Sequence, residues 1–151
     1  MKSWVLAAVV AAGVGSAGVA LAQSNIVAER RAGLTRMEGD FEAIAATVQG
    51  RGDQRQLTGR IDGMIAFYRD LPNSFPAATL TPPLSTGRQP GETRARDTID
   101  ANRADFAQRN ADMVNALTAL KASAEAGGIT GDTLRALGGT CLACHRGYRA
   151  R

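Results

Sequence analysis

The chain has 151 residues, of which 44% are hydrophobic and 21% are charged, so one compact domain is expected. This composition excludes collagen-like, low-complexity and broadly disordered chains. The 18 basic residues are scattered among 14 acidic ones and form no basic stripe of the kind that binds nucleic acid, so we expect no nucleic-acid partner.

Residues 1–22 have the pattern of a secretory signal peptide. Lys2 is followed by a long apolar run that ends in an Ala-x-Ala cleavage site at Ala22. An uncleaved membrane anchor is the alternative, because the run approaches the roughly 20 residues that span a bilayer. Cleavage would lower the formal charge from +4 to +3 and leave residues 23–151 as a single exported domain without a membrane contact.

Two amphipathic helices are expected first. Apolar residues recur at steps of three and four over residues 26–48 and again over residues 57–71. A glycine-containing turn at residues 49–53 separates the two stripes, and Pro72 ends the second one. All five prolines then lie in residues 72–91, which are expected to form a long connection.

Two more helices complete the expected architecture. A third stripe runs from about Glu92 to Ala126, with apolar residues at seven-residue spacing. A fourth begins near Asp132, a good N-cap residue, and presents one apolar face as far as Tyr148. No segment shows the alternation of a strand. Four helices with short turns and one long link predict an all-α, antiparallel up-down-up-down four-helix bundle.

The strongest motif in the chain is Cys141-Leu142-Ala143-Cys144-His145. On a helix the two cysteines lie on the same side about one turn of 5.4 Å apart, where they can form thioethers with the two vinyl groups of a haem. His145 follows at once and is placed to bind the iron axially. With an export signal, this pattern is typical of c-type haem attachment and predicts one covalently attached haem c per chain.

Two other roles for these cysteines and this histidine have less support from the sequence. A thiol oxidoreductase would place the cysteines between a strand and a helix, whereas this motif lies in a helical segment. A zinc site would need a carboxylate as its fourth ligand, because the chain has two cysteines and one histidine. No nucleophile, general acid or carboxylate pair is arranged for catalysis, so we do not expect an enzyme.

The chain has one histidine, so no second histidine can bind the iron opposite His145. The other face of the haem must meet a methionine, the single lysine of the mature chain, an external ligand or nothing. Met64 and Met113 lie on apolar stripes and are expected in the core. Leu34 and Met37 lie one turn apart on one face of the first helix, and either side chain could sit over the iron.

The attachment site is followed by only six residues, and this placement resembles the class II cytochromes c, the cytochrome c′ and cytochrome c-556 family. The resemblance extends to Arg30-x-x-x-Leu34-Thr35-x-Met37, to Leu71-Pro72-x-x-Phe75-Pro76 and to Cys141-x-x-Cys144-His145-x-x-Tyr148-Arg149. It implies a periplasmic four-helix bundle that encloses a covalently bound haem on its fourth helix. It also implies a homodimer, commonly through the first and second helices, and an unidentified periplasmic redox partner.

In this family the first helix supplies the residue over the distal face of the haem, and the resemblance puts Leu34 at that position. A leucine there resembles cytochrome c′, whose five-coordinate iron binds small gases such as nitric oxide and carbon monoxide and is capable of electron transfer. Met37 as a sixth ligand would instead resemble the low-spin c-556 electron carriers, since a thioether fills the site that an aliphatic side chain leaves free. Arg149 matches an arginine beside the proximal histidine, and Arg30 resembles a position near a haem propionate.

Overall fold

The computed structural model describes residues 13–81 and 93–151, with side chains from Gln23 onward. The helices, in chain order, are α1 (Gly13–Gln49), the 3-10 helix η1 (Gln54–Leu57), α2 (Thr58–Asp70), the 3-10 helices η2 (Leu71–Ser74) and η3 (Ala77–Thr79), α3 (Thr98–Ala101), α4 (Arg103–Glu125) and α5 (Gly131–Tyr148). The described part contains no strand, only two isolated β-bridges.

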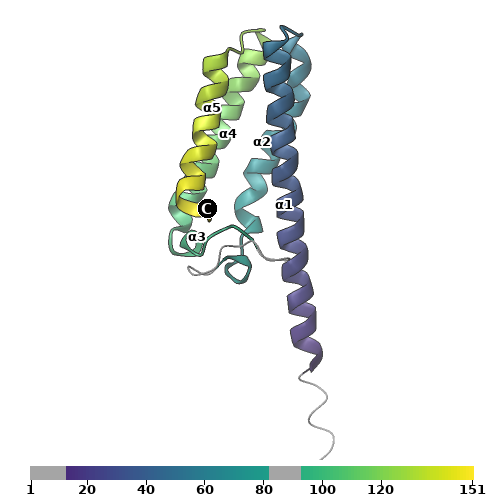
Figure 1. Ribbon diagram of the computed structural model, residues 1–151, viewed down its shortest axis with the longest axis vertical. Coiled ribbons are helices and arrows are strands. Elements are labelled where there is room, and N and C mark those ends of the chain that lie inside the picture. The colour runs from purple at the N-terminus through teal and green to yellow at the C-terminus, as the bar shows by residue number, and fades with distance from the viewer. Residues whose placement is uncertain (1–12, 82–92) are drawn as a thin grey trace, which may run out of the picture.

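The four long helices form the predicted antiparallel bundle (Figure 1). The turn between α1 and α2 and the turn between α4 and α5 lie at one end, and the C-terminus lies at the other. The N-terminal part of α1 extends past the end of the other helices. The all-α, four-helix fold class is therefore confirmed. None of the helices in the described part of the chain is long and apolar enough to cross a membrane.

The two turns at one end of the bundle are fixed by local hydrogen bonds and by one side chain that joins them. Gly127 ends α4 with a φ of +67°, a left-handed conformation that glycine adopts without strain. Thr130 begins α5 with a capping box, in which its hydroxyl accepts a hydrogen bond from the N–H of Thr133. The amide of Gln54 then accepts a hydrogen bond from the N–H of Ile129 and donates one to its carbonyl, which ties the two turns together.

The prediction that the third helix begins near Glu92 is wrong. Residues 93–96 lie outside any helix, because their backbone groups pair with distant segments and not with one another. The N–H of Arg96 donates to the carbonyl of Tyr148 at 3.0 Å, and the N–H of Ala150 donates to the carbonyl of Arg94 at 2.8 Å. Helix α4 starts only after Asn102, whose φ of −131° and ψ of 42° interrupt the helix.

The connection predicted over residues 72–91 is described only as far as residue 81, and residues 82–91 lie outside the described residues. Its described part contains the 3-10 helices η2 and η3, and the side chains of Phe75 and Thr79 are buried there. Helix α1 also begins well before the predicted residue 26.

The buried side chains form two clusters stacked along the bundle. The first cluster includes Met37, Ile44, Ile61, Met64, Met113, Leu117, Leu120, Leu134 and Leu137. The second consists of Leu71, Phe75, Ile99, Phe106 and Tyr148. The ring of Phe106 makes edge contacts with both other aromatic rings of this second cluster, at centroid distances of 4.9 and 5.2 Å. As predicted, Met64 and Met113 are core residues.

Candidate functional site

Helix α5 places the two cysteines at the junction of the two clusters. Cys141 packs against the first cluster, and Cys144 packs against the second. Both are free thiols and both are half-buried. Because they are three residues apart on one helix, their sulfur atoms lie on the same side of α5, facing the interior of the bundle.

The surroundings of the two thiols keep them protonated. Burial raises the pKa of the Cys141 thiol above its ordinary value, and burial likewise raises that of Cys144. The positive charge of Arg109 on α4 acts in the opposite direction on the pKa of Cys144. In the described part of the chain no group of three or more His, Cys, Asp or Glu side chains could hold a metal ion, so further ligands for a zinc site are lacking there.

His145 lies on the last turn of α5, in surroundings that favour the neutral imidazole. Burial lowers its pKa first, and the charges of Arg149 and Arg94 lower it further, whereas Glu38 on α1 acts in the opposite direction. A neutral imidazole is the form that binds iron. Two free thiols one turn apart and an adjacent imidazole have the chemistry that covalent haem attachment needs.

The two candidates for the distal position lie in different clusters. Met37 is only 2% exposed and packs inside the first cluster, as an ordinary core side chain does. Leu34 is half-buried and packs against the second cluster, the same cluster that Cys144 contacts. Of the two, Leu34 therefore packs against the same cluster as Cys144.

Arg30 is buried, with 3% exposure, and its guanidinium binds the segment between α2 and α3. Nη1 donates to the carbonyl of Ser74 at 2.7 Å and to the hydroxyl of Thr79 at 3.1 Å. Nη2 donates to the carbonyl of Thr79 at 3.2 Å and to the hydroxyl of Thr93 at 2.8 Å. The guanidinium carbon also lies 4.3 Å from the centre of the Phe75 ring. These acceptors are neutral, and burial lowers the pKa of Arg30 to about 10.

Arg149 follows the last turn of α5 directly. Its N–H donates to the carbonyl of His145 at 3.1 Å, and its side chain is exposed. The charge of Arg149 lowers the pKa of the imidazole, so the two side chains interact electrostatically. Arg94 reaches the same end of α5 from the segment before α3, because its Nε and Nη2 donate to the carbonyl of Ala150 at 3.1 and 2.9 Å.

Sequence reasoning missed Tyr68 as a neighbour of the cysteines. Tyr68 lies on α2, packs against both clusters and is close enough to Cys141 and Cys144 for their charges to contribute to its raised pKa, of which burial is the larger cause. It brings a phenol, which can donate a hydrogen bond, to the interior side of the attachment motif. Its place in the apolar stripe of the second helix gave no sign of this proximity.

A second contact that the sequence did not indicate joins α4 to the end of α5. The carboxylate of Asp105 accepts a hydrogen bond from the hydroxyl of Tyr148 and forms an ion pair with Arg109. Arg109 Nη1 in turn donates to the carbonyl of Ala143, between the two cysteines, at 3.5 Å. This arrangement holds the attachment helix against α4.

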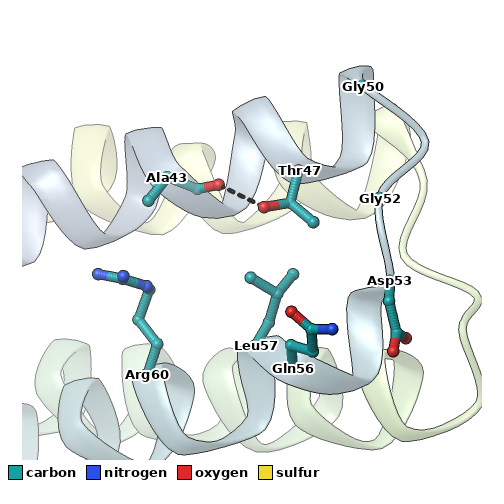
Figure 2. A pocket seen from close by; sticks show the side chains of 8 residues that line it. All are labelled: Ala43, Thr47, Gly50, Gly52, Asp53, Gln56, Leu57 and Arg60. Carbon is teal, nitrogen blue, oxygen red and sulfur yellow. Dashed lines mark hydrogen bonds between the residues drawn. The ribbon is translucent and has the colours of Figure 1, made fainter.

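The structure has a pocket of about 430 Å³ where α1 ends and α2 begins, at the end of the bundle opposite the C-terminus (Figures 1 and 2). Ala43 and Thr47 on α1 face Leu57 and Arg60 across it. The pocket contains neither cysteine nor the histidine, and it lies away from the attachment motif.

The chain is similar to cytochromes c′ over most of its length. The family model for cytochrome c′ matches residues 25–149. Cytochrome c′ from Rhodopseudomonas palustris is 27% identical over 136 residues, which cover 89% of this chain and 88% of that protein.

Three solved structures resemble the fold closely. A triple mutant of the Rhodopseudomonas palustris cytochrome c′ has a TM-score of 0.64 at 27% identity, over 83% of this chain and 98% of that one. A ferrous arginine-to-glutamine variant of cytochrome c′ from Alcaligenes xylosoxidans has a TM-score of 0.62 at 25% identity, over 84% and 96%. Cytochrome c′ from Thermochromatium tepidum, at 22% identity, shares the fold with a TM-score of 0.67 over 85% and 97%.

Proposed function

The chain belongs to the cytochrome c′ family and carries covalently attached haem c, and we propose that it is a periplasmic protein that binds small gases and transfers electrons. In this proposal Cys141 and Cys144 form the two thioethers, and His145 is the axial ligand. The haem supplies an iron atom that changes oxidation state and binds diatomic gases. Leu34 would lie over the distal face and could not coordinate the iron, so that nitric oxide and carbon monoxide would find an open site.

The observation that carries the open site is the different packing of Leu34 and Met37. Met37 is enclosed by the first cluster with 2% exposure, so its sulfur already has core neighbours. Leu34 packs with the cluster that Cys144 contacts, and its aliphatic side chain cannot coordinate iron. An apolar side chain beside the attachment helix favours a pocket that admits uncharged diatomic gases.

The two arginines have different support. Arg149 acts beside the proximal face, where its charge disfavours the imidazolium form of His145. Arg30 remains a candidate for the haem surroundings, because its recorded acceptors are neutral and an anionic propionate nearby would compensate its charge. Its first role is to fasten the segment between α2 and α3 to α1.

The experiment that tests the open site is the visible absorption spectrum of the purified protein, oxidised and then reduced with dithionite, before and after addition of carbon monoxide. We expect broad, merged high-spin bands in the reduced form and a large shift with carbon monoxide. Sharp low-spin bands that do not respond to carbon monoxide would contradict the proposal and identify a c-556-type carrier with Met37 as the sixth ligand. A protein without a haem spectrum, made in cells competent for attachment, would contradict both.

Export to the periplasm would remove residues 1–22 and leave Gln23 as the first residue. The family match begins at residue 25, close to the predicted mature start at Gln23. We expect Gln23 as the N-terminal residue of protein recovered from the periplasm, measured by mass spectrometry. A mature chain that retains residues 1–22 in the membrane fraction would support the anchor instead.

The family resemblance supports a homodimer through α1 and α2. Sedimentation equilibrium should then give twice the mass of the haem-loaded chain. A redox partner in the periplasm is part of the same proposal. No catalytic residue is assigned.

A further inference from the structure

The outward face of α5 carries an unusual side chain. Leu142 is 59% exposed, and among the described residues no other large hydrophobic side chain is largely exposed to solvent. Arg135, Gly139, Leu142 and Arg146 follow one another at steps of four, three and four, so they lie in one row along the helix. We call this row the Leu142 face.

The helix beside Leu142 is uncovered, and the residues that follow it are rich in arginine. A Cβ atom added at Gly138 or at Gly139 would meet open space, so nothing from the described chain covers this part of the helix. The chain has no acidic residue after Asp132, whereas the same stretch contains Arg135, Arg146, Arg149 and Arg151. An apolar centre with a charged rim is the arrangement of a protein interface.

Helix stability accounts for only part of this pattern. Cations in the last turn of a helix interact favourably with its dipole, and Arg146 Nε donates to the carbonyl of Leu142 at 3.4 Å. Neither effect explains an exposed leucine, nor Arg135 near the start of the helix, whose ion pair with Asp132 is exposed on both sides. The exposed leucine and the adjacent Arg146 together make this face available for a contact outside the chain.

We propose that the Leu142 face docks an acidic electron-transfer protein, an inference that rests on the electron-transfer part of the proposed function. Leu142 lies between Cys141 and Cys144, so a partner seated on it is one or two residues from both thioethers. The apolar side chain enters the partner surface, and Arg146 meets a carboxylate of the partner, whereas Arg135 is already paired with Asp132. The small area fits the weak, short-lived complexes of redox proteins.

The test is the reaction of the reduced haem-loaded protein with an acidic blue copper protein, followed by stopped flow. One electron leaves the reduced cytochrome and converts one Cu(II) of the probe to Cu(I), with no bond made or broken. We expect the second-order rate constant to fall about tenfold between low salt and near-physiological salt. Leu142→Gln and Arg146→Gln should each lower the low-salt rate constant about threefold or more.

The matched control is Arg55→Gln, which removes the same charge from exposed η1 at the other end of the bundle. Its rate constant should fall much less than that of Arg146→Gln. Equal effects of the two charge changes, or a rate constant independent of salt and of Leu142→Gln, would overturn the proposal. Visible spectra and reduction by dithionite should be unchanged in every variant, which shows that haem and fold are intact.

Failure of the docking proposal can be told apart from failure of the electron-transfer function. In one outcome, the protein exchanges electrons with a small uncharged mediator, but its rate constant with the acidic probe is unchanged by both substitutions. Such a protein has the electron-transfer function and lacks the docking face. A protein that exchanges electrons with neither contradicts the function itself. Binding to vesicles rich in phosphatidylserine that Leu142→Gln abolishes, with an unchanged rate constant, would assign the face to a membrane surface and overturn the proposal.

Discussion

The hydroxyl of Tyr148 donates a hydrogen bond of 2.5 Å to the carboxylate of Asp105, and this bond joins the end of α5 to the start of α4. The same carboxylate lies 2.8 Å from Nε of Arg109, one turn along α4. Tyr148 is three residues beyond His145, so the bond restrains the helical turn that presents the imidazole. The ring of Tyr148 is also held by an edge contact with Phe106.

Tyr148→Phe should destabilise the protein in a pH-dependent way. The hydrogen bond from Tyr148, followed by that from Arg109, lowers the pKa of Asp105 below its usual value. A lowered carboxyl pKa contributes stability above the unfolded-state pKa of about 4, and this contribution is lost as pH falls through the folded-state pKa. Thermal unfolding should show a Tm a few degrees lower for the variant at pH 7, and a difference that shrinks below about pH 4.

Tyr68→Phe is the control for this measurement, because among the described residues no carboxylate accepts a hydrogen bond from the Tyr68 hydroxyl. Its effect on Tm should not change over the acidic range. A Tyr148→Phe effect that stays constant from pH 7 to pH 3 would show that the carboxylate bond is not its cause.

Arg30→Ala should lower the free energy of unfolding by about 3 kcal/mol, because four hydrogen bonds from a buried charged group are lost. The measurement is urea denaturation of the haem-loaded protein. Arg36→Ala, at an exposed position on the same helix, should cost about 0.5 kcal/mol or less. Equal costs for the two substitutions would contradict the role given to Arg30.

Gly33→Ala and Gly39→Ala should change stability in opposite directions. A Cβ at Gly33 would lie 2.3 Å from Cε2 of Phe67, so α1 and α2 would have to separate or the ring would have to move. We expect a cost of about 1–3 kcal/mol. At Gly39 nothing lies within 4 Å, and replacing glycine inside a helix should raise stability by about 0.5–1 kcal/mol. Urea denaturation measures both, and a stabilised Gly33→Ala would show that the helices do not approach so closely.

Met37→Ala separates the two coordination states. With Leu34 over the iron, removing a methionine that packs in the first cluster should leave the high-spin spectrum unchanged and lower the free energy of unfolding by about 2–5 kcal/mol. Conversion of a low-spin spectrum to a high-spin one would instead identify Met37 as a ligand. Met64→Ala is the matched control, since this methionine is buried to a similar extent in the same cluster.

The cysteines of the chain made without haem attachment should alkylate slowly at pH 8. Burial raises the pKa of both thiols, so the reactive thiolate is less populated than in a free cysteine peptide, and the rate should rise as pH increases. Mass spectrometry after iodoacetamide treatment measures the rate. In the haem-loaded protein neither sulfur should react, and alkylation of either would show that its thioether is absent.

Long apolar stripes made the helices predictable, since the period of a helix is a local property of the chain. The same local reasoning failed at residues 93–97, where the backbone pairs with Tyr148 and Ala150, some fifty residues away. Seven-residue spacing beginning at Ile99 predicted a continuous helix from about Glu92. The residues before Ile99 instead form hydrogen bonds with distant segments of the chain. The break at Asn102 had no signal in the stripe.

The class of the fold and the haem chemistry could be predicted from the sequence, because helical periodicity and the spacing of Cys141, Cys144 and His145 are local patterns that extend over a few consecutive turns. Only the tertiary structure decided which side chains surround that motif. The acceptors of the buried Arg30 lie 44 to 63 residues away in the sequence, and Tyr68 and Asp105 approach α5 from other helices. Contacts at such separation depend on how the helices pack, which local spacing does not encode.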